Sequence, residues 1–350
     1  MTNDHYLSVV RSGASADAAG TPAPPVLLAP LSGVTDLHMR RIARRLGASA
    51  VVSEMVAAAE FARGASEARL RAEGAGVSPH VVQLAGCAPE AMAEAARLCE
   101  AAGADVIDVN MGCPAKTVTG GEAGSALMRD LDHAARILAA VRDAVRVPVT
   151  VKMRLGWDHA SLNAAELARR AESLGLAAVT VHGRTRQQFY KSSADWAAIR
   201  AVVAAVSLPV IANGDVTDLA GARACLAASG AAGVMVGRAA VGRPWLVGQI
   251  ANALAGRPVR EPSPAEKADI AAEHYLGLID LYGAAMGVRH ARKHLAAYVE
   301  AADNGGTGGP ALAPADRTRL LTTHDPDVAR ALLRRAFLEP ASAGPIGEAA

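Results

Sequence analysis

Polar side chains stand at the carboxyl ends of short apolar runs in this sequence, and they are the residues that could do chemistry. The set comprises Gln83, Asn110, Lys152, Arg154, His182, Arg184, Asn213, Asp215 and Arg238. Any one of them could be an ordinary loop residue after a strand. Lys152 lies within an apolar run, where an unpaired ammonium is unfavourable, so we expect it to face a partly anionic ligand or a carboxylate.

Two glycine-containing segments near the end of this series suggest a phosphate site. They are Asn213-Gly214-Asp215 and Gly237-Arg238. Glycine lets backbone N–H groups approach a ligand closely, and arginine supplies a charged fork for phosphate oxygens. Turns without a ligand would also explain both glycines. We expect a phosphorylated ligand here.

Cys113 is the cysteine most suited to chemistry. It follows an apolar run directly, in the segment 110–114 (NMGCP), whereas Cys99 and Cys225 fall within helical apolar patterns. A lone cysteine is more often a small buried apolar residue, which is what we expect of Cys87, Cys99 and Cys225. A protonated thiol can donate a proton, whereas a nucleophile would need a base such as His182 within hydrogen-bonding reach.

The elements that must position these residues are eight short apolar runs that alternate with amphipathic, helix-like segments. The runs are Val26–Ala29, Ala50–Ser53, His80–Leu84, Asp105–Asn110, Pro148–Met153, Ala178–His182, Pro209–Asn213 and Gly233–Gly237. Such alternation is typical of a parallel sheet buried on both faces, and eight units close a (β/α)8 barrel. A doubly wound open sheet is the alternative fold. In a barrel, chemistry lies at the carboxyl ends of the strands, so the polar residues should meet there.

The 350 residues exceed a barrel of typical size by roughly 100. We expect a flexible tail over residues 1–25, a catalytic barrel over 26–256, a helical domain over 257–340 and a flexible tail over 341–350. Pro258, Pro262 and Pro264 would form the linker, and helical patterns cover Ala265–Tyr282, Val288–Ala301 and Asp325–Phe337. The Gly- and Pro-rich segment 303–314 should be a loop.

Composition excludes several classes of protein. A net charge of +2 is too small for a polybasic nucleic-acid coat, and 3% aromatic residues argue against a surface that holds single strands mainly by stacking. There is no CxxC pair, P-loop or GxGxxG motif, so zinc, a disulfide framework and a Rossmann dinucleotide site are not indicated. With no signal peptide or membrane span recognisable, we expect a cytoplasmic protein without metal.

Taken together, six segments resemble the tRNA-dihydrouridine synthases, particularly the B-type bacterial branch also described as nitrogen-regulation-like proteins. They are residues 29–36 (APLSGVTD), 110–116 (NMGCPAK), 151–154 (VKMR), 182–185 (HGRT), 213–215 (NGD) and 237–238 (GR). The resemblance covers nearly the whole barrel. The chain departs from the commonest pattern at Leu31 and Ser32, where Met and Ala are frequent, and at Thr117, where Lys is frequent.

The resemblance implies an FMN-binding barrel with a helical domain that helps to hold tRNA. By position in the motifs, the residues implied to contact FMN are Pro30, Leu31, Ser32, Gln83, Lys152, His182, Asn213, Gly214, Asp215, Gly237 and Arg238. Asn110, Arg154 and Arg184 would face the substrate. Cys113 would be the general acid.

The reaction implied is reduction of the C5=C6 bond of one uridine in folded tRNA. NADPH would reduce the flavin, flavin N5 would give a hydride to C6, and Cys113 would protonate C5. The target base would leave its stack to reach the barrel, which favours a uridine in a loop, and the B-type resemblance suggests the D-loop.

Arg289, Arg292 and Lys293 are spaced for one face of a helix in the last third of the chain, where they could bind RNA phosphates. An ordinary solvated helix face is the simpler explanation. We expect a monomer that binds tRNA and does not bind a membrane. The alternatives are a flavin barrel acting on a free pyrimidine or another small molecule, and a binding or regulatory protein without turnover. Cys113 and Lys152 argue against the latter.

Overall fold

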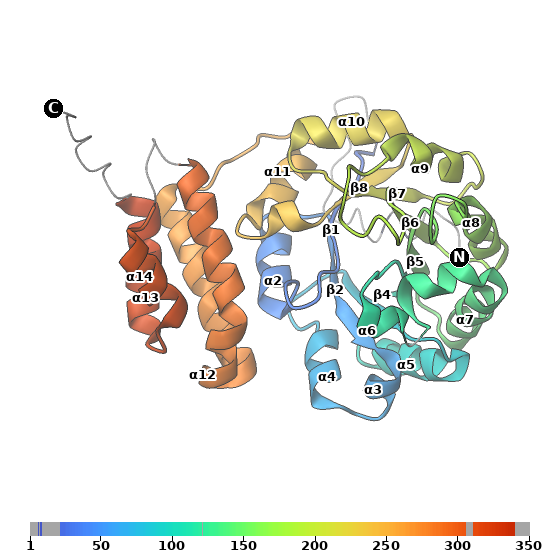
Figure 1. Ribbon diagram of the computed structural model, residues 1–350, viewed down its shortest axis with the longest axis horizontal. Coiled ribbons are helices and arrows are strands. Elements are labelled where there is room, and N and C mark those ends of the chain that lie inside the picture. The colour runs from blue at the N-terminus through green and yellow to red at the C-terminus, as the bar shows by residue number, and fades with distance from the viewer. Residues whose placement is uncertain (1–5, 7, 9–21, 121, 306–310, 340–350) are drawn as a thin grey trace. The chain divides into compact units, whose positions relative to one another are not determined.

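A computed structural model describes residues 6, 8, 22–120, 122–305 and 311–339 of the chain. Within them, eight parallel strands form a closed barrel in the order β1 to β8 (Figure 1). The barrel closes where β1 pairs with β8, with Val26 beside Val234 and Leu28 beside Val236. The predicted barrel is therefore confirmed, and the doubly wound alternative is wrong because an open sheet would leave two unpaired edges.

The strands lie where the apolar runs predict them. They are β1 (Val26–Leu28), β2 (Ala50–Ala57), β3 (His80–Ala85), β4 (Val106–Met111), β5 (Val149–Arg154), β6 (Ala178–His182), β7 (Val210–Asn213) and β8 (Gly233–Val236). Most of their side chains are buried on both faces, as expected of parallel strands covered by helices.

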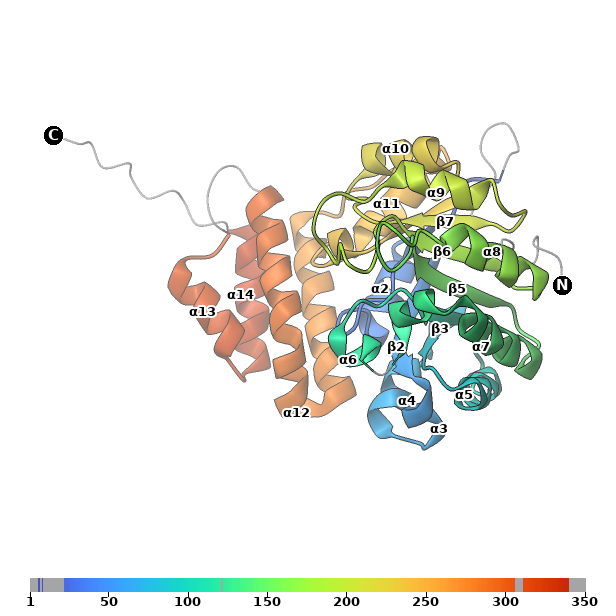
Figure 2. The same ribbon diagram turned by 45° about the vertical axis from the view of Figure 1, so that its right-hand side comes forward.

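Helices connect the strands and cover the barrel. Those of the first 254 residues are α2 (Leu37–Arg45), α3 (Ala58–Ala62), α4 (Ser66–Ala72), α5 (Pro89–Ala101), α6 (Lys116–Thr119), α7 (Leu131–Ala144), α8 (Ala164–Ser173), α9 (Trp196–Val203), α10 (Leu219–Ser229) and α11 (Trp245–Leu254), with short 3-10 helices at Gly124–Arg129 and Arg238–Ala240. Figure 2 shows α7, α8, α9 and α10 outside the strands. Aspartates such as Asp130, Asp195 and Asp218 cap helix starts by accepting backbone N–H bonds.

Apolar side chains from seven of the strands fill the barrel interior together with Tyr6, whose exposed fraction is 4%. Because its neighbours include Leu27, Val52 and Val81, near the starts of their strands, Tyr6 fills the amino-terminal end of the barrel. The expectation of a flexible tail is therefore wrong at Tyr6. Most of residues 1–25, and all of 341–350, lie outside the described residues.

The chain divides into two compact units, one of Met1–Ala239 with Leu246–Val259 and one of Ala240–Trp245 with Arg260–Ala350. In the second unit, α12 (Pro264–Gly305) packs on α14 (Pro326–Leu338), and α13 (Pro314–Thr322) contacts both. Gly283 interrupts α12 with φ 75° and ψ 163°, so this helix consists of two, as the separate patterns before and after it predict. The predicted loop starts later than expected, since residues 303–305 are helical; residues 306–310 lie outside the described part. None of the described helices is long and apolar enough to cross a membrane.

Candidate active site

The predicted site residues of the barrel gather at the carboxyl ends of its strands. Strand register sets Asn110 beside Lys152, Arg154 beside His182, and His182 beside Asn213. Neighbouring strands of a barrel end at one rim, so these side chains come from four consecutive strands into one region.

A chain of hydrogen bonds runs from the barrel interior to the cysteine loop. The Asp108 carboxylate accepts from Thr150 Oγ1 (2.6 Å) and from Gln83 Nε2 (2.7 Å). Gln83 Oε1 then accepts from Asn110 Nδ2 (2.7 Å), and Asn110 Oδ1 accepts from the backbone N–H of Cys113 (3.0 Å). Because a carboxylate can only accept, Asp108 fixes which way both amides point.

Cys113 is held by its backbone while its thiol stays free and partly exposed. Its backbone N–H donates to Asn110, and its carbonyl accepts from the backbone N–H (3.0 Å) and from the hydroxyl (2.8 Å) of Ser125. Cys113 lies near enough to Lys152 and Arg154 for the negative charge of a thiolate to raise the pKa of both side chains. Cys99 and Cys225 are buried as predicted, and Cys87 is half-buried.

Lys152 makes no hydrogen bond or ion pair with any described residue. Desolvation lowers the pKa of its ammonium from 10.5 to about 8, and the positive charge of Arg154 adds to this effect, while Asp108 and Cys113 oppose it. Asp108 is itself desolvated, which raises its pKa despite its hydrogen bonds. A poorly solvated cation without a fixed partner is suited to an anionic ligand.

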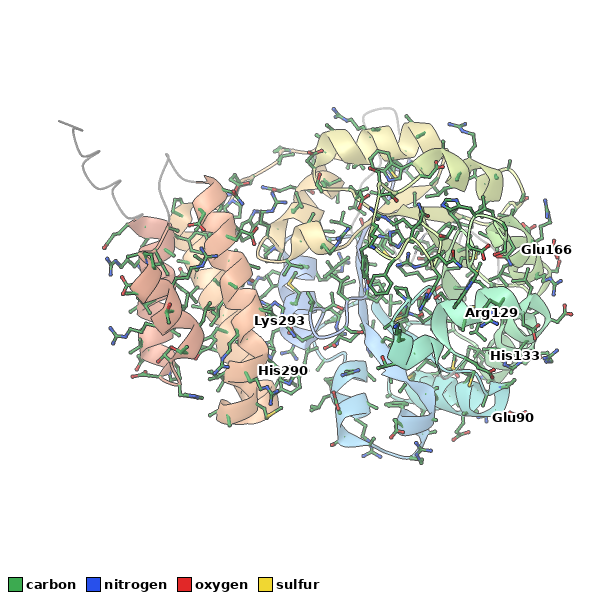
Figure 3. All side chains as sticks on the ribbon, viewed as in Figure 1. Glu90, Arg129, His133, Glu166, His290 and Lys293 are labelled. Carbon is green, nitrogen blue, oxygen red and sulfur yellow. The ribbon has the colours of Figure 1, made fainter. Side chains whose placement is uncertain are left out.

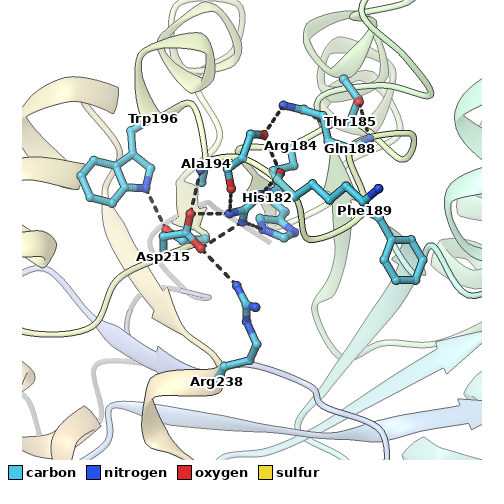
Figure 4. A network of polar contacts seen from close by, with 12 residues as sticks. His182, Arg184, Thr185, Gln188, Phe189, Ala194, Trp196, Asp215 and Arg238 are labelled. Atoms are coloured by element: carbon cyan, nitrogen blue, oxygen red, sulfur yellow. Dashed lines mark hydrogen bonds and ion pairs between the residues drawn. The ribbon is translucent and has the colours of Figure 1, made fainter.

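After the neighbouring strands β6, β7 and β8, Asp215 joins two arginines (Figure 4). Its carboxylate accepts both Nη atoms of Arg184 (3.0 and 2.5 Å), Nη2 of Arg238 (3.2 Å) and the backbone N–H of Ala194 (2.8 Å). Partial burial alone would raise the pKa of Asp215, but these hydrogen bonds and charges outweigh it and hold the pKa below its ordinary value. Asp215 thus stays ionised and holds Arg238, whose side chain is 62% exposed.

Arg184 is 2% exposed, and all five of its N–H groups have an acceptor. In addition to Asp215, they donate to the carbonyls of Lys191 (3.2 Å) and Ser192 (2.6 Å) and to His182 Nε2 (3.2 Å). The predicted substrate contact of Arg184 therefore has no free donor in this arrangement. Arg184 is placed to order the rim.

His182 is neutral in this setting. Desolvation lowers its pKa well below 6.5, and the positive charges of Lys152, Arg154, Arg184 and Arg238 act in the same direction. Because a guanidinium can only donate, Nε2 accepts from Arg184 and the proton of the neutral ring resides on Nδ1. His182 could offer a ligand an N–H donor at Nδ1.

The glycines of the predicted phosphate site differ in what surrounds them. Gly214 has φ 118°, and a Cβ there would lie 2.7 Å from Ala194 Cβ and 2.7 Å from His182 Cδ2, so only glycine fits. At Gly237 an added Cβ would lie 3.9 Å from Ala29 Cβ and 4.0 Å from Leu31 Cδ2, which is ordinary van der Waals contact without a clash. Asn213 donates to the carbonyl of Met235 (2.9 Å) and joins the ends of β7 and β8.

Arg154 is 1% exposed and supports the loops around the site. Its Nε donates to the carbonyl of Gly112 (2.8 Å), and its Nη1 to those of Thr185 and Phe189 (2.9 Å each). Desolvation lowers its pKa from 12.5 to about 10. Its Nη2 makes no hydrogen bond with a described residue, so two donors remain for the ligand contact that the sequence predicts.

Three predicted residues follow β1 in a turn. The backbone N–H of Leu31 already donates to Thr35 Oγ1 (3.0 Å), and its carbonyl accepts from the N–H of Val34 (2.9 Å). Pro30 and Leu31 are half-buried and Ser32 is exposed. The turn is thus firmly held at the rim, but Leu31 has no backbone donor to spare.

In the second unit, Arg289, Arg292 and Lys293 are exposed on α12, and none has an ion pair or hydrogen bond with a described residue. Figure 3 shows Lys293 and the neighbouring His290 on this helix. The structure confirms the predicted helical spacing, which places three cations on one helix.

The sequence analysis missed Asp108, Thr150 and Tyr190. Asp108 lies inside an apolar run, two residues before Asn110, and period-two alternation could have placed both on the barrel interior. Tyr190 has the guanidinium carbons of Arg154 and Arg238 at 5.7 and 5.3 Å from its ring centroid. No local pattern in the sequence indicates that contact.

Comparisons with known proteins identify the family of this chain. The family described as dihydrouridine synthase (Dus) matches residues 27–306. The chain is 53% identical over 319 residues to "Probable tRNA-dihydrouridine synthase" of Rhodobacter capsulatus, covering 90% of this chain and 95% of that protein. It is 48% identical over 280 residues to "tRNA-dihydrouridine synthase B" of Xanthomonas axonopodis pv. citri, covering 79% and 84%. The chain belongs to the dihydrouridine synthase family.

Proposed function

We propose that this protein reduces the C5=C6 bond of a specific uridine in tRNA to 5,6-dihydrouridine, with bound FMN as cofactor and NADPH as reductant. Family membership and the names of the relatives support the reaction and the tRNA substrate. The observation that carries the proposal is the pairing of a free thiol, Cys113, with an unpartnered ammonium, Lys152, on one barrel rim.

The residues of the rim fit FMN. Lys152, an ammonium of lowered pKa without a partner among the described residues, suits the ring, which becomes negative on reduction. Gln83 uses one N–H of its amide for Asp108 and keeps the other, which could reach the ring beside the Nδ1–H of His182. The exposed guanidinium of Arg238 suits the phosphate, and Gly237 next to it presents backbone without a side chain.

Asp215 has a different role in this proposal from the direct FMN contact that the resemblance implies. A carboxylate would repel a phosphate, but its charge is matched by Arg184 and Arg238. Asp215 would therefore aim Arg238 at the phosphate rather than contact it. Asn213 and Gly214 would set the backbone of the same loop. The turn Pro30–Ser32, which follows the neighbouring strand β1, would line the site next to Gly237.

The chemistry divides between cofactor and protein. When bound, FMN would supply the hydride that adds to C6 of the uridine, after reduction by NADPH. Cys113 Sγ then donates its proton to C5, which completes the reduction and leaves a thiolate. The positive charges of Lys152 and Arg154 stabilise this thiolate, and solvent at the partly exposed thiol returns the proton.

Asn110 and Arg154 would act on the substrate side. Asn110 Oδ1 holds the Cys113 backbone, while its Nδ2 keeps one N–H beyond the bond to Gln83. Arg154 keeps both N–H groups of Nη2. These donors could bind the carbonyl groups of a uracil ring and so orient C5 towards Cys113. Arg289, Arg292 and Lys293 would hold RNA phosphates.

The test is to map dihydrouridine in tRNA from cells with and without the gene. We expect one position, or a small set, to lose dihydrouridine, and to regain it when the gene is restored or when purified protein is added with FMN and NADPH. An unchanged dihydrouridine map, together with purified protein that does not bind FMN, would contradict the proposal.

A further inference from the structure

The loop that follows β6, residues 183–195, presents two adjacent exposed aromatic side chains. Phe189 is 40% and Tyr190 48% exposed, and their rings meet edge to face with centroids 4.8 Å apart. No other Phe, Tyr or Trp among the described residues is exposed. In a chain with so few aromatic residues, this concentration at the rim of the site calls for an explanation.

Phe189 is also held in an unfavourable backbone conformation. Its φ of 56° lies in the left-handed region, which a bulky residue rarely adopts. Its N–H donates to the carbonyl of Arg186 (3.0 Å), and its own carbonyl accepts from the buried Arg154 (2.9 Å). In Figure 4 the Phe189 ring points away from the Asp215 network. Neither the strained backbone nor the exposed apolar ring of Phe189 stabilises the fold, and residues of this kind are concentrated at functional sites.

Cations flank this loop. The guanidinium carbons of Arg129 and Arg186 lie 5.0 and 4.8 Å from the ring centroid of Trp157. The backbone of Gln187 donates to the carbonyl of Trp157 (2.9 Å), which ties this group to the loop after β6. A guanidinium that rests its face on an aromatic ring keeps its N–H edges for a phosphate.

Arg129 is exposed and makes no hydrogen bond or ion pair with a described residue. The two acidic residues next to this group in the sequence are engaged in local turns. Asp130 caps α7 by accepting from His133 N (2.9 Å), and Asp158 accepts from Ala160 N (3.0 Å) and Ser161 Oγ (2.8 Å). The guanidinium N–H groups of Arg129 and Arg186 are therefore the groups that could bind a partner.

We propose that Phe189 stacks on an unpaired base of the RNA substrate, and that Arg129 and Arg186, held over Trp157, bind phosphates next to that base. An exposed ring with arginines beside it has the chemistry of surfaces that hold unpaired RNA bases, in which aromatic faces stack on bases and basic groups follow the backbone. The contact lies outside the FMN site, and it rests on the proposed function because it requires tRNA as the substrate.

The first experiment measures tRNA affinity of the FMN-loaded enzyme with three variants. Phe189→Gly relieves the backbone strain at position 189 and removes the ring, whereas Phe189→Trp keeps an aromatic ring. Ser192→Gly is the control for strain: it relieves a similar positive φ (59°) at another position of the same loop and leaves both rings in place. We expect Phe189→Gly to weaken binding by about 5-fold or more, because one base–aromatic stack is worth that much. Phe189→Trp and Ser192→Gly should stay within about 2-fold of the wild type.

Three outcomes would overturn the proposal. Phe189→Gly could bind tRNA as tightly as the wild type. Ser192→Gly could weaken binding as much as Phe189→Gly, which would point to the order of the loop rather than to the ring. Phe189→Gly could raise the KM for NADPH while leaving tRNA affinity unchanged, which would assign the ring to the nucleotide reductant.

The second experiment tests the cations through the salt dependence of tRNA binding. Arg129→Ala should reduce the slope of log affinity against log salt by about 0.7 to 0.9, the value for one phosphate contact. Arg223→Ala on α10 is the matched control, since Arg223 is also exposed and has no partner among the described residues. Equal slopes for the two variants would contradict the proposal.

These results are separable from a failure of the proposed function. If the wild-type enzyme binds no tRNA above an unrelated RNA, the proposed function fails first. If the wild type binds tRNA and forms dihydrouridine, while Phe189→Gly and Arg129→Ala behave like it, the function stands and this contact is rejected. FMN content and the rate of flavin reduction by NADPH should be unchanged in both variants.

Discussion

The thiol of Cys113 is positioned by hydrogen bonds to its backbone, so its side chain can be changed without releasing the loop. Asn110 Oδ1 and both polar groups of Ser125 hold the main chain on either side of the sulfur. The chemistry of the thiol and the shape of the site can therefore be tested separately.

Cys113→Ala should bind FMN and tRNA normally and lose most uridine reduction, because no thiol remains to protonate C5 of the uridine. We expect a fall in the reduction rate of about 100-fold or more, in the range of general acid catalysis. Flavin reduction by NADPH is the internal control and should not change. Full dihydrouridine formation by this variant would rule out Cys113 as the acid.

We expect the buried charge of Lys152 to destabilise the fold, although the same charge suits the proposed flavin. Its folded pKa of about 8 lies below the ordinary 10.5, so the unfolded chain binds the proton more tightly and the charged form disfavours folding at pH 7. In FMN-free protein, Lys152→Met should raise the free energy of unfolding by about 1–2 kcal/mol at pH 7. The advantage should shrink as pH rises from 8 to 10.5, since the wild type then loses the buried charge.

Chemical denaturation of FMN-free protein at pH 7 and pH 10 measures this effect. Lys191→Met is the matched control, because Lys191 is exposed and its stability change should be small at both values of pH. A Lys152→Met variant that is less stable than the wild type at pH 7 would show that the ammonium has a stabilising partner.

The sequence predicts the individual site residues unevenly, and the reason is physical. Gln83, Asn110 and Lys152 stand out because polar groups are rare at the end of apolar strands. Their partner Asp108 does not stand out, because it acts through contacts across β3 and β5. Arg184 is predicted as a residue of the site, but its role is not, because its N–H groups are occupied by carbonyls seven and eight residues further along the chain and by Asp215. Such contacts depend on how the loops fold.

Among the elements, the strands are the best predicted, because burial on both faces gives a strong local signal. All eight predicted runs overlap the observed strands. Helices without a clear apolar period are harder to predict: α13 was missed, since its segment begins inside an expected loop. The break within α12 at Gly283 agrees with the predicted end of the first helical pattern at Tyr282.

The loop after β7 depends on a glycine for its shape. Gly214→Ala would place a Cβ 2.7 Å from Ala194 Cβ and from His182 Cδ2, on a backbone with φ 118°. We expect the free energy of unfolding to fall by about 1–3 kcal/mol and FMN binding to weaken, because His182 and the loop must move. Denaturation of FMN-free protein separates the first effect from the second.

Gly237→Ala provides the comparison for stability, since an added Cβ there meets no atom closer than 3.9 Å. Its free energy of unfolding should stay within about 0.5 kcal/mol of the wild type. If both glycine variants were equally stable, the steric argument for Gly214 would be wrong.

At the scale of the whole molecule, a net charge of +2 limits how RNA can be held. Without a general positive field, binding must depend on a few placed cations and on the shape of the tRNA. On α12, Arg289, Arg292 and Lys293 have no carboxylate partner among the described residues, whereas Arg330, Arg334 and Arg335 on α14 each pair with an aspartate. The second unit therefore supplies two sets of three cations that differ in whether their charge is already matched.

Replacing Arg289, Arg292 and Lys293 together by Gln should weaken tRNA binding and lower the slope of log affinity against log salt by about 2 to 3, because three phosphate contacts are lost. The same replacement of Arg330, Arg334 and Arg335 removes equal charge, so a smaller effect there would show that position matters more than net charge. FMN content should be the same in both triple variants. If the two triple variants weakened tRNA binding equally, α12 would offer no specific phosphate contact, and tRNA affinity would depend only on the overall charge of the protein.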